Sequence, residues 1–314
     1  MTSNVCLPRR RSLAALTAAA ATLAVPRVNA AEPPRRVLAS FSILADMVRE
    51  VAPPELEVTP LVGVDADAHV FEPRPHDSRR LAEAGLVVVN GLGFEGWIDR
   101  LVKASGYAGP VVVATQGVAP RKAAGGHSHG HSHGHRHDGP DPHAWQDVAL
   151  AGRYVDNLAA GLAARWPSLA PVIQGRAVAY RQRLAALDAS LRTQFSAVPA
   201  DRRRVITSHD AFGYFGAAYG VEFLSPRGWV TGSEPSAAAV ARLIRQIRDQ
   251  GVRAVFVENI TDTRLMERIA KEGGAQVGGV LYSDALSAPG GPADSYVRMM
   301  EHNARTLLQA MAPR

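Results

Sequence analysis

Cysteine is almost absent from the sequence, since Cys6 is the only one among 314 residues. Cys6 lies within residues 1–30, a segment that we expect to be removed when the protein is exported. A mature chain without cysteine forms neither disulfide bonds nor thiolate bonds to metals. Any metal that it binds must therefore be held by histidine, aspartate or glutamate.

An apolar run long enough to span a bilayer is missing from the N-terminal region, because the run at residues 13–25 is too short. Three arginines precede this run, and Val28-Asn29-Ala30 offers small residues to a signal peptidase, so we predict a signal peptide over 1–30. The adjacent arginines fit both the Sec and the twin-arginine export routes. Because Cys6 precedes the run, whereas a lipoprotein cysteine would follow it, we expect a soluble periplasmic protein without a lipid anchor.

No excess of either charge sign is left after residues 1–30 are removed. That segment takes away four arginines and no acidic residue, which leaves 31 basic against 29 acidic side chains. A net charge of +2 offers no concentrated basic surface, which excludes nucleic acid as a partner. The roughly 284 remaining residues exceed the usual size of one hydrophobic core and predict two domains.

Short apolar, β-rich runs alternate with helical patterns on both sides of one long helix. Strands that are apolar on both faces and separated by helices predict parallel sheets. We therefore expect an α/β fold with an N-terminal lobe over 31–166 and a C-terminal lobe over 199–314, each with a mostly parallel four-stranded sheet and flanking helices. The expected strands cover 37–40, 56–62, 86–90 and 111–114, then 204–208, 221–225, 254–258 and 276–282; the expected helices cover 42–51, 78–84, a segment from 97, 236–249, 263–271 and 293–311.

Between the two lobes, apolar residues recur at spacings of three and four, which predicts one long amphipathic helix of roughly eight turns. Pro167 and Pro199 bound this pattern, because proline disfavours helix in the residue before it. We assign 167–198 to this linking helix. The recurring apolar residues are Ile173, Ala177, Tyr180, Leu184, Leu187, Leu191 and Phe195.

Histidine is concentrated in the segment 117–141, which has no apolar pattern, is rich in glycine and serine and is predicted to be a disordered loop. Closely spaced imidazoles predict weak, exchanging zinc binding near neutral pH. We hypothesise that the loop collects zinc or senses its abundance; the alternative is a simple soluble insertion. The histidines of the loop are His127, His129, His131, His133, His135 and His137.

Three other histidines and one aspartate stand in small polar motifs at expected strand ends. Ligands of open parallel sheets bind beyond the carboxyl ends of the strands, so these motifs lie where a ligand site is expected. The motifs are Asp67-Ala68-His69-Val70-Phe71-Glu72-Pro73, Asp141-Pro142-His143-Ala144-Trp145, Ser208-His209-Asp210-Ala211-Phe212-Gly213-Tyr214 and Tyr282-Ser283-Asp284-Ala285-Leu286.

In this order and at these separations, the four motifs resemble those of the zinc and manganese solute-binding proteins of ABC importers. The similarity covers essentially the whole mature chain, including the histidine-rich loop and the long helix. It implies two α/β lobes joined by one rigid helix, with a single metal ion in the cleft between them. It also implies that His69 and His143 from the first lobe and His209 and Asp284 from the second are the metal ligands.

The expected cargo is Zn²⁺, with Mn²⁺ as the alternative. Three neutral imidazoles and one carboxylate suit a tetrahedral zinc ion. Manganese members of the family more often have a carboxylate in the third place, where this chain has His209. The resemblance further implies an ABC permease as the partner, and we expect a monomer that also meets a periplasmic metallochaperone.

Each proposed ligand has a simpler explanation. A histidine at a strand end is commonly a hydrogen-bonded polar residue, and Asp284 could instead cap a helix that begins at Ala285. We expect surface positions for His76 and His302. Roles that support a ligand or cap a loop are expected for Asp67, Glu72 and Asp210.

The predicted function is high-affinity capture of zinc in the periplasm and delivery to an ABC permease, without enzymatic activity. A zinc hydrolase would need an open coordination position and a general base, whereas Asp284 fills the fourth position and no His-Glu-x-x-His sequence is present. An adhesion or structural surface protein is the second alternative. The expected absence of a lipid anchor argues against it.

Overall fold

The computed structural model describes residues 1–2, 34–121, 139–228, 231–232 and 234–313. All but the first two residues of the predicted signal peptide lie outside this part of the chain, as do the six histidines of the predicted loop. From residue 34 onward the described chain belongs to one compact unit with two β-sheets. None of the described helices is both long enough and apolar enough to cross a membrane.

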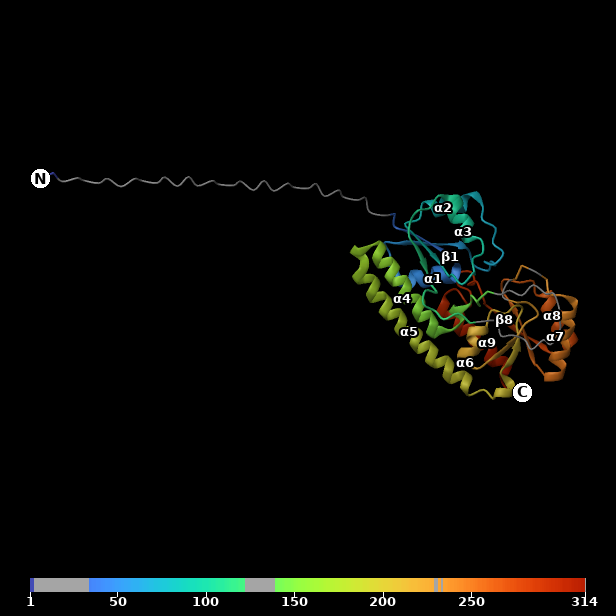
Figure 1. Ribbon diagram of the computed structural model, residues 1–314. Coiled ribbons are helices and arrows are strands. Elements are labelled where there is room, and N and C mark those ends of the chain that lie inside the picture. The colour runs from blue at the N-terminus through green and yellow to red at the C-terminus, as the bar shows by residue number, and fades with distance from the viewer. Residues whose placement is uncertain (3–33, 122–138, 229–230, 233, 314) are drawn as a thin grey trace. The chain divides into compact units, whose positions relative to one another are not determined.

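The first sheet is parallel throughout, as expected. Its strand β3 reads Leu-Val-Val-Val and buries all four side chains, which is typical of a strand covered on both faces. Helices α1 (Ser42–Val51), α2 (Pro75–Ala82) and α3 (Ile98–Ser105) flank the sheet (Figure 1). In spatial order the strands are β2 (Glu57–Val62), β1 (Arg36–Phe41), β3 (Leu86–Val89) and β4 (Val111–Val113).

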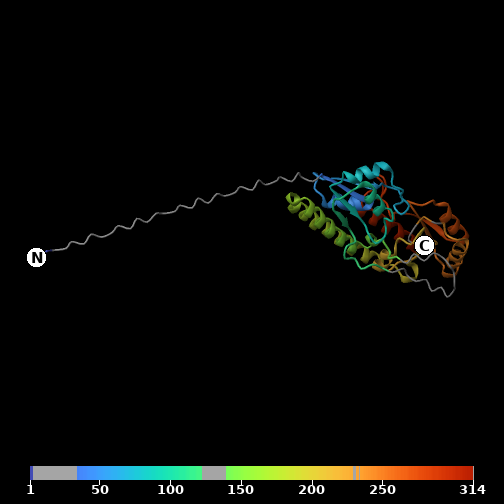
Figure 2. The same ribbon diagram turned by 45° about the horizontal axis from the view of Figure 1, so that its top comes forward.

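The predicted long helix is α5 (Ala170–Ser196), and all seven of its recurring apolar residues are buried. It begins after the short 3-10 turn η2 (Pro167–Leu169) and ends ahead of Pro199, as the two prolines predict. A second helix, α4 (Val148–Arg165), was not predicted and packs along α5 (Figure 1 and Figure 2). The long helix α5 links the lobes, as predicted, and α4, at the end of the first lobe, packs beside it.

The second sheet repeats the strand arrangement of the first and is also parallel. Its helices are α6 (Gly213–Tyr219), which was not predicted, and α7 (Ala237–Gln250), α8 (Arg264–Gly273) and α9 (Tyr296–Met311). In spatial order its strands are β6 (Glu222–Leu224), β5 (Arg204–Ile206), β7 (Ala254–Glu258) and β8 (Gln276–Leu281).

One large cluster of buried apolar side chains runs from the first sheet through α4 and α5 to α6, α9 and β8. The final helix α9 contacts α1 of the first lobe as well as α5. A smaller separate cluster lies between α7, α8 and the second sheet. Because the large cluster is shared by both lobes, the packing resists a wide hinge motion between them.

Candidate metal centre

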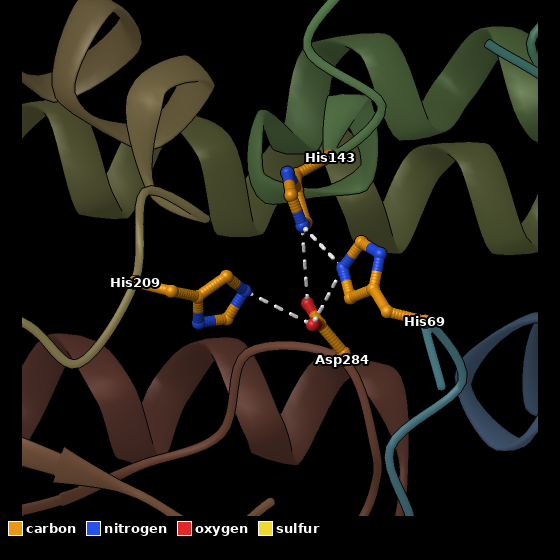
Figure 3. Close-up of side chains that lie close together, drawn as sticks. All are labelled: His69, His143, His209 and Asp284. Atoms are coloured by element: carbon orange, nitrogen blue, oxygen red, sulfur yellow. Dashed lines mark hydrogen bonds and ion pairs between the residues drawn. The ribbon is translucent and has the colours of Figure 1, made fainter. Parts of the chain in front are cut away.

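Three of the four residues that the sequence motifs single out lie in loops that follow strands, whereas His143, which was also expected at a strand end, has no described strand directly before it. His69 follows β2, and His143 lies directly before the 3-10 turn η1 (Ala144–Gln146). His209 follows β5, and Asp284 follows β8. One ligand atom from each of these four residues lies within 4.8 Å of the others, with the side chains pointing toward one another (Figure 3).

The separations between the donor atoms match the size of a metal ion. His69 Nε2 lies 3.2 Å from His143 Nε2 and 3.2 Å from Asp284 Oδ2. Asp284 also has Oδ2 at 3.1 Å from His209 Nε2 and Oδ1 at 3.5 Å from His143 Nε2. A tetrahedral zinc ion with bonds of about 2.0 to 2.1 Å places its donors about 3.3 Å apart, and these four separations are close to that value.

Burial makes this arrangement costly without a cation. His143, His209 and Asp284 are 0% exposed, and the side chain of His69 is 3% exposed. Neither carboxylate oxygen of Asp284 receives a hydrogen bond of ordinary geometry from the described chain. A buried carboxylate without donors is strongly unfavourable, and a metal ion held at this point would satisfy both oxygens.

Electrostatic coupling shifts the pKa values within the cluster. Burial opposes ionisation of Asp284, but the imidazoles of His209 and His143 outweigh burial and hold the pKa of Asp284 well below its usual value. Burial also disfavours the charged form of His209, yet Glu258 and Asp284 raise its pKa well above the usual value. For His69, burial dominates and lowers the pKa. The site thus keeps an ionised carboxylate facing the imidazoles.

Two further carboxylates stand behind the imidazoles. Asp141 Oδ1 lies 2.9 Å from Nδ1 of His143, and Glu258 Oε2 lies 2.7 Å from Nδ1 of His209. Carboxylates in this position orient ligating histidines and raise their basicity. Sequence reasoning missed Glu258. The available signal was a single carboxylate at the end of the otherwise apolar strand β7.

Contacts across the lobes hold the loop that carries Asp284. The backbone oxygen of Ser283 accepts hydrogen bonds from Trp145 Nε1 at 3.0 Å and Gln146 Nε2 at 2.9 Å. The backbone nitrogen of Leu286 donates to Ser42 Oγ at 3.0 Å. The first lobe therefore fixes the position of a residue that the second lobe supplies.

The remaining residues named from the sequence lie outside the cluster. No helix begins directly after Asp284, since the next helix, α9, starts only at Tyr296. The explanation of Asp284 as a helix cap is therefore wrong. The exposed His76 pairs with Asp77, and His302 Nε2 contacts the backbone oxygen of Val280. Asp67 accepts a hydrogen bond from the backbone nitrogen of His69, Glu72 is exposed, and the backbone nitrogen of Asp210 donates to Gly228.

Comparison with known protein families gives a match over most of the chain. The model of the ZnuA family, described as "Zinc-uptake complex component A periplasmic", matches residues 37–310. The manganese-binding lipoprotein MntA of Halalkalibacterium halodurans is 30% identical over 278 residues, which is 88% of each chain. The zinc-binding protein TroA of Treponema pallidum is 31% identical over 281 residues, again 88% of each chain.

Solved structures of similar proteins share the fold. The structure of periplasmic zinc binding protein TroA from Treponema pallidum superimposes with a TM-score of 0.81 at 29% identity, over 90% of this chain and 100% of TroA. A Mn-bound periplasmic metal binding protein from Candidatus Liberibacter asiaticus gives a TM-score of 0.77 at 26% identity, over 88% of this chain and 99% of that protein. The two-lobed arrangement is therefore common to relatives named for different metals.

Proposed function

The chain belongs to the family of periplasmic zinc-uptake components, and from that premise we propose that it binds one Zn²⁺ tightly and delivers it to the permease of an ABC importer. As a member of this family it is a metal-binding substrate-binding protein that works with a membrane permease and an ATPase, and it is not an enzyme. We further propose that it acts in the periplasm, as a monomer, and that a periplasmic metallochaperone can load it.

The assignment of His69, His143, His209 and Asp284 as ligands is part of this proposal. The observation that carries it is the convergence of three buried imidazole nitrogens on one buried carboxylate, at nitrogen–oxygen distances of 3.1 to 3.5 Å. Among divalent ions, a site with three nitrogen donors and one oxygen donor favours Zn²⁺ over Mn²⁺, which prefers carboxylate, carbonyl and water oxygens. The nitrogen of His209 is the donor that tips this balance.

Competition between Zn²⁺ and Mn²⁺ tests the proposal. Chelator-stripped protein without its predicted signal peptide is titrated with each ion, alone and against a chelator of known affinity. His209→Ala is compared with His302→Ala, a control on helix α9. We expect one tight zinc site that His209→Ala weakens and His302→Ala leaves unchanged. A preference for Mn²⁺ would overturn the choice of ion and support the manganese-specific alternative; absence of any tight site would overturn the function.

We also propose that the histidine-rich segment binds zinc weakly and independently of the cluster. The support is its composition, with six histidines at alternate positions from His127 to His137. Deletion of residues 125–138 is expected to leave one tight site and to remove the weak ones, as counted by calorimetric titration with Zn²⁺. Replacing the six histidines with asparagine gives a control of unchanged length. Loss of the tight site in the asparagine variant would contradict independence.

A further inference from the structure

Glu258 occupies a central position in the second sheet. It is the last residue of β7, which lies between β5, the strand that precedes His209, and β8, the strand that precedes Asp284. The residue is only 1% exposed. A carboxylate buried at this depth is costly unless its oxygens are satisfied, so its contacts indicate why it is there.

The two carboxylate oxygens of Glu258 contact different parts of the chain. Oε1 accepts hydrogen bonds from the backbone nitrogens of Ser208 at 2.7 Å and His209 at 3.0 Å. Oε2 lies 2.7 Å from Nδ1 of the His209 ring. One side chain therefore holds both the backbone and the imidazole of the same residue.

This arrangement determines which nitrogen of His209 faces the cluster. A carboxylate can only accept, so at a separation of 2.7 Å Nδ1 carries the proton of this pair, although its N–H bond is not aligned with Oε2 as in an ordinary hydrogen bond. When a metal ion occupies the centre, Nε2, which lies 3.1 Å from Asp284 Oδ2, is the nitrogen that remains to ligate it. We propose that Glu258 is a positioning residue that fixes the tautomer and orientation of His209 and thereby sets the metal affinity. This inference rests on the proposed function of the site.

Asp141 offers a matched comparison because it supports His143 in a different way. A single oxygen, Oδ1, lies 3.0 Å from the backbone nitrogen of His143 and 2.9 Å from its Nδ1. In Asp141→Asn the amide oxygen can stay at this point and accept from both groups. The tautomer of His143 is then preserved.

In Glu258→Gln, by contrast, no orientation of the amide can accept from both the backbone N–H groups and the His209 ring. If the amide oxygen stays with the two backbone N–H groups, the amide N–H₂ faces Nδ1 of His209 and donates to it. The proton of the neutral ring then moves to Nε2, where it blocks the metal. If the amide is flipped, its N–H₂ group faces two backbone donors, which leaves buried donors unsatisfied. Either arrangement disturbs His209, although Gln has nearly the same shape as Glu.

The test measures Zn²⁺ affinity and metal-free melting temperature in wild type, Glu258→Gln and Asp141→Asn. We expect affinity to fall by about 10- to 100-fold in Glu258→Gln and by less than about fivefold in Asp141→Asn. Glu222→Gln, an exposed change on β6, is the surface control. The metal-free melting temperature of Glu258→Gln should fall modestly, because either orientation of the amide leaves a buried group poorly satisfied.

Visible absorption of the Co²⁺-loaded proteins adds a readout of the coordination itself, and we expect it to change in Glu258→Gln alone. Unchanged affinity in Glu258→Gln, or equal losses in both amide variants, would overturn the tautomer assignment. An unchanged Co²⁺ spectrum in Glu258→Gln would reduce Glu258 to a structural role and would also overturn the assignment. Failure of the wild type to bind any metal would instead overturn the proposed function.

Discussion

Glu95 in the first lobe and Asp284 in the second are both buried carboxylates, yet their pKa values shift in opposite directions. Burial raises the pKa of Glu95, although Ser40 Oγ and the backbone nitrogens of Asn90 and Gly91 donate to it. Asp284 lacks such donors but faces imidazoles, which lower its pKa despite burial. The second-lobe carboxylate is therefore the one prepared to meet a cation.

The neighbours of the histidines also differ between the lobes, with aromatic rings in the first and carboxylates in the second. In the first lobe, the ring of Phe94 lies 4.7 Å from that of His69, and the ring of Trp145 lies 5.2 Å from that of His143. In the second lobe, His209 lies between the carboxylates of Asp284 and Glu258. The first lobe thus supplies aromatic rings and one supporting carboxylate, Asp141, whereas the second supplies two carboxylates, Asp284 and Glu258.

Asp284→Asn is expected to produce the largest effect, because it removes the one carboxylate that faces all three imidazoles. Breaking a buried charged interaction on one side costs about 3 to 5 kcal/mol. Zinc affinity should therefore fall by about 1,000-fold, which corresponds to about 4 kcal/mol in binding free energy. Competition titration against a strong chelator measures the loss.

The control for this change is Asp262→Asn, an exposed aspartate that pairs with Arg264 and lies on the same lobe. It should leave zinc affinity unchanged. A loss of less than about tenfold in Asp284→Asn would show that the first lobe contributes more of the binding energy than its apolar lining suggests.

The parallel sheets and the long helix were predictable because their signals are local. Runs such as Leu86–Val89 are apolar on both faces, and the spacing of the apolar residues in 170–196 follows one helical face. Helix α4 was missed because its sequence is rich in alanine and includes two glycines, Gly152 and Gly161, which blur the difference between its faces. Its buried face is selected by packing against α5, which is a tertiary effect.

The four side chains of the cluster were singled out by motifs and strand ends, and the structure brings them together. Their role as ligands stays a prediction. The support from Glu258 could not be predicted, because it depends on the strand order β6-β5-β7-β8. That order places residue 258 beside residues 208 and 209, and nothing local in the sequence encodes a pairing over about fifty residues.

Phe94→Ala should have a smaller effect on binding and a clear one on stability. Phe94 is 1% exposed, and its ring lies 4.8 Å from that of Phe41 and 4.9 Å from that of Trp145. Removing such a ring costs about 3 to 5 kcal/mol of unfolding free energy. Because Phe94 also packs on His69, we expect zinc affinity to fall as well, by about tenfold.

Urea denaturation of the metal-free protein measures the stability change, and Phe212→Ala provides a matched loss in the second lobe, where Phe212 stacks on Phe223 at 5.1 Å. Phe212→Ala should destabilise similarly but leave affinity unchanged. Phe94→Leu, with a smaller expected cost, keeps the comparison possible if the alanine variant does not fold. If the two alanine variants changed zinc affinity equally, Phe94 would have no specific role in supporting the metal site.

Asp46 is a further, partly buried carboxylate of the first lobe, and it should make the stability of the protein depend modestly on pH. It lies on α1, and its Oδ2 accepts a hydrogen bond from the backbone nitrogen of Tyr296 at the start of α9. Burial raises the pKa of Asp46 to about 6, from 3.8. Because the unfolded chain releases this proton at lower pH than the folded protein does, the free energy of unfolding falls as pH rises from about 4 to about 6.

Asp46→Asn should remove this penalty while its amide oxygen still accepts from Tyr296. We expect the variant to be more stable than wild type by about 1 to 3 kcal/mol near pH 7.5, with the difference shrinking as pH falls toward 4. Urea denaturation of the metal-free proteins across this range measures it. Zinc affinity should not change. A stability difference that is independent of pH would show that Asp46 is ionised at little cost, and the first lobe would then tolerate buried charge as well as the second does.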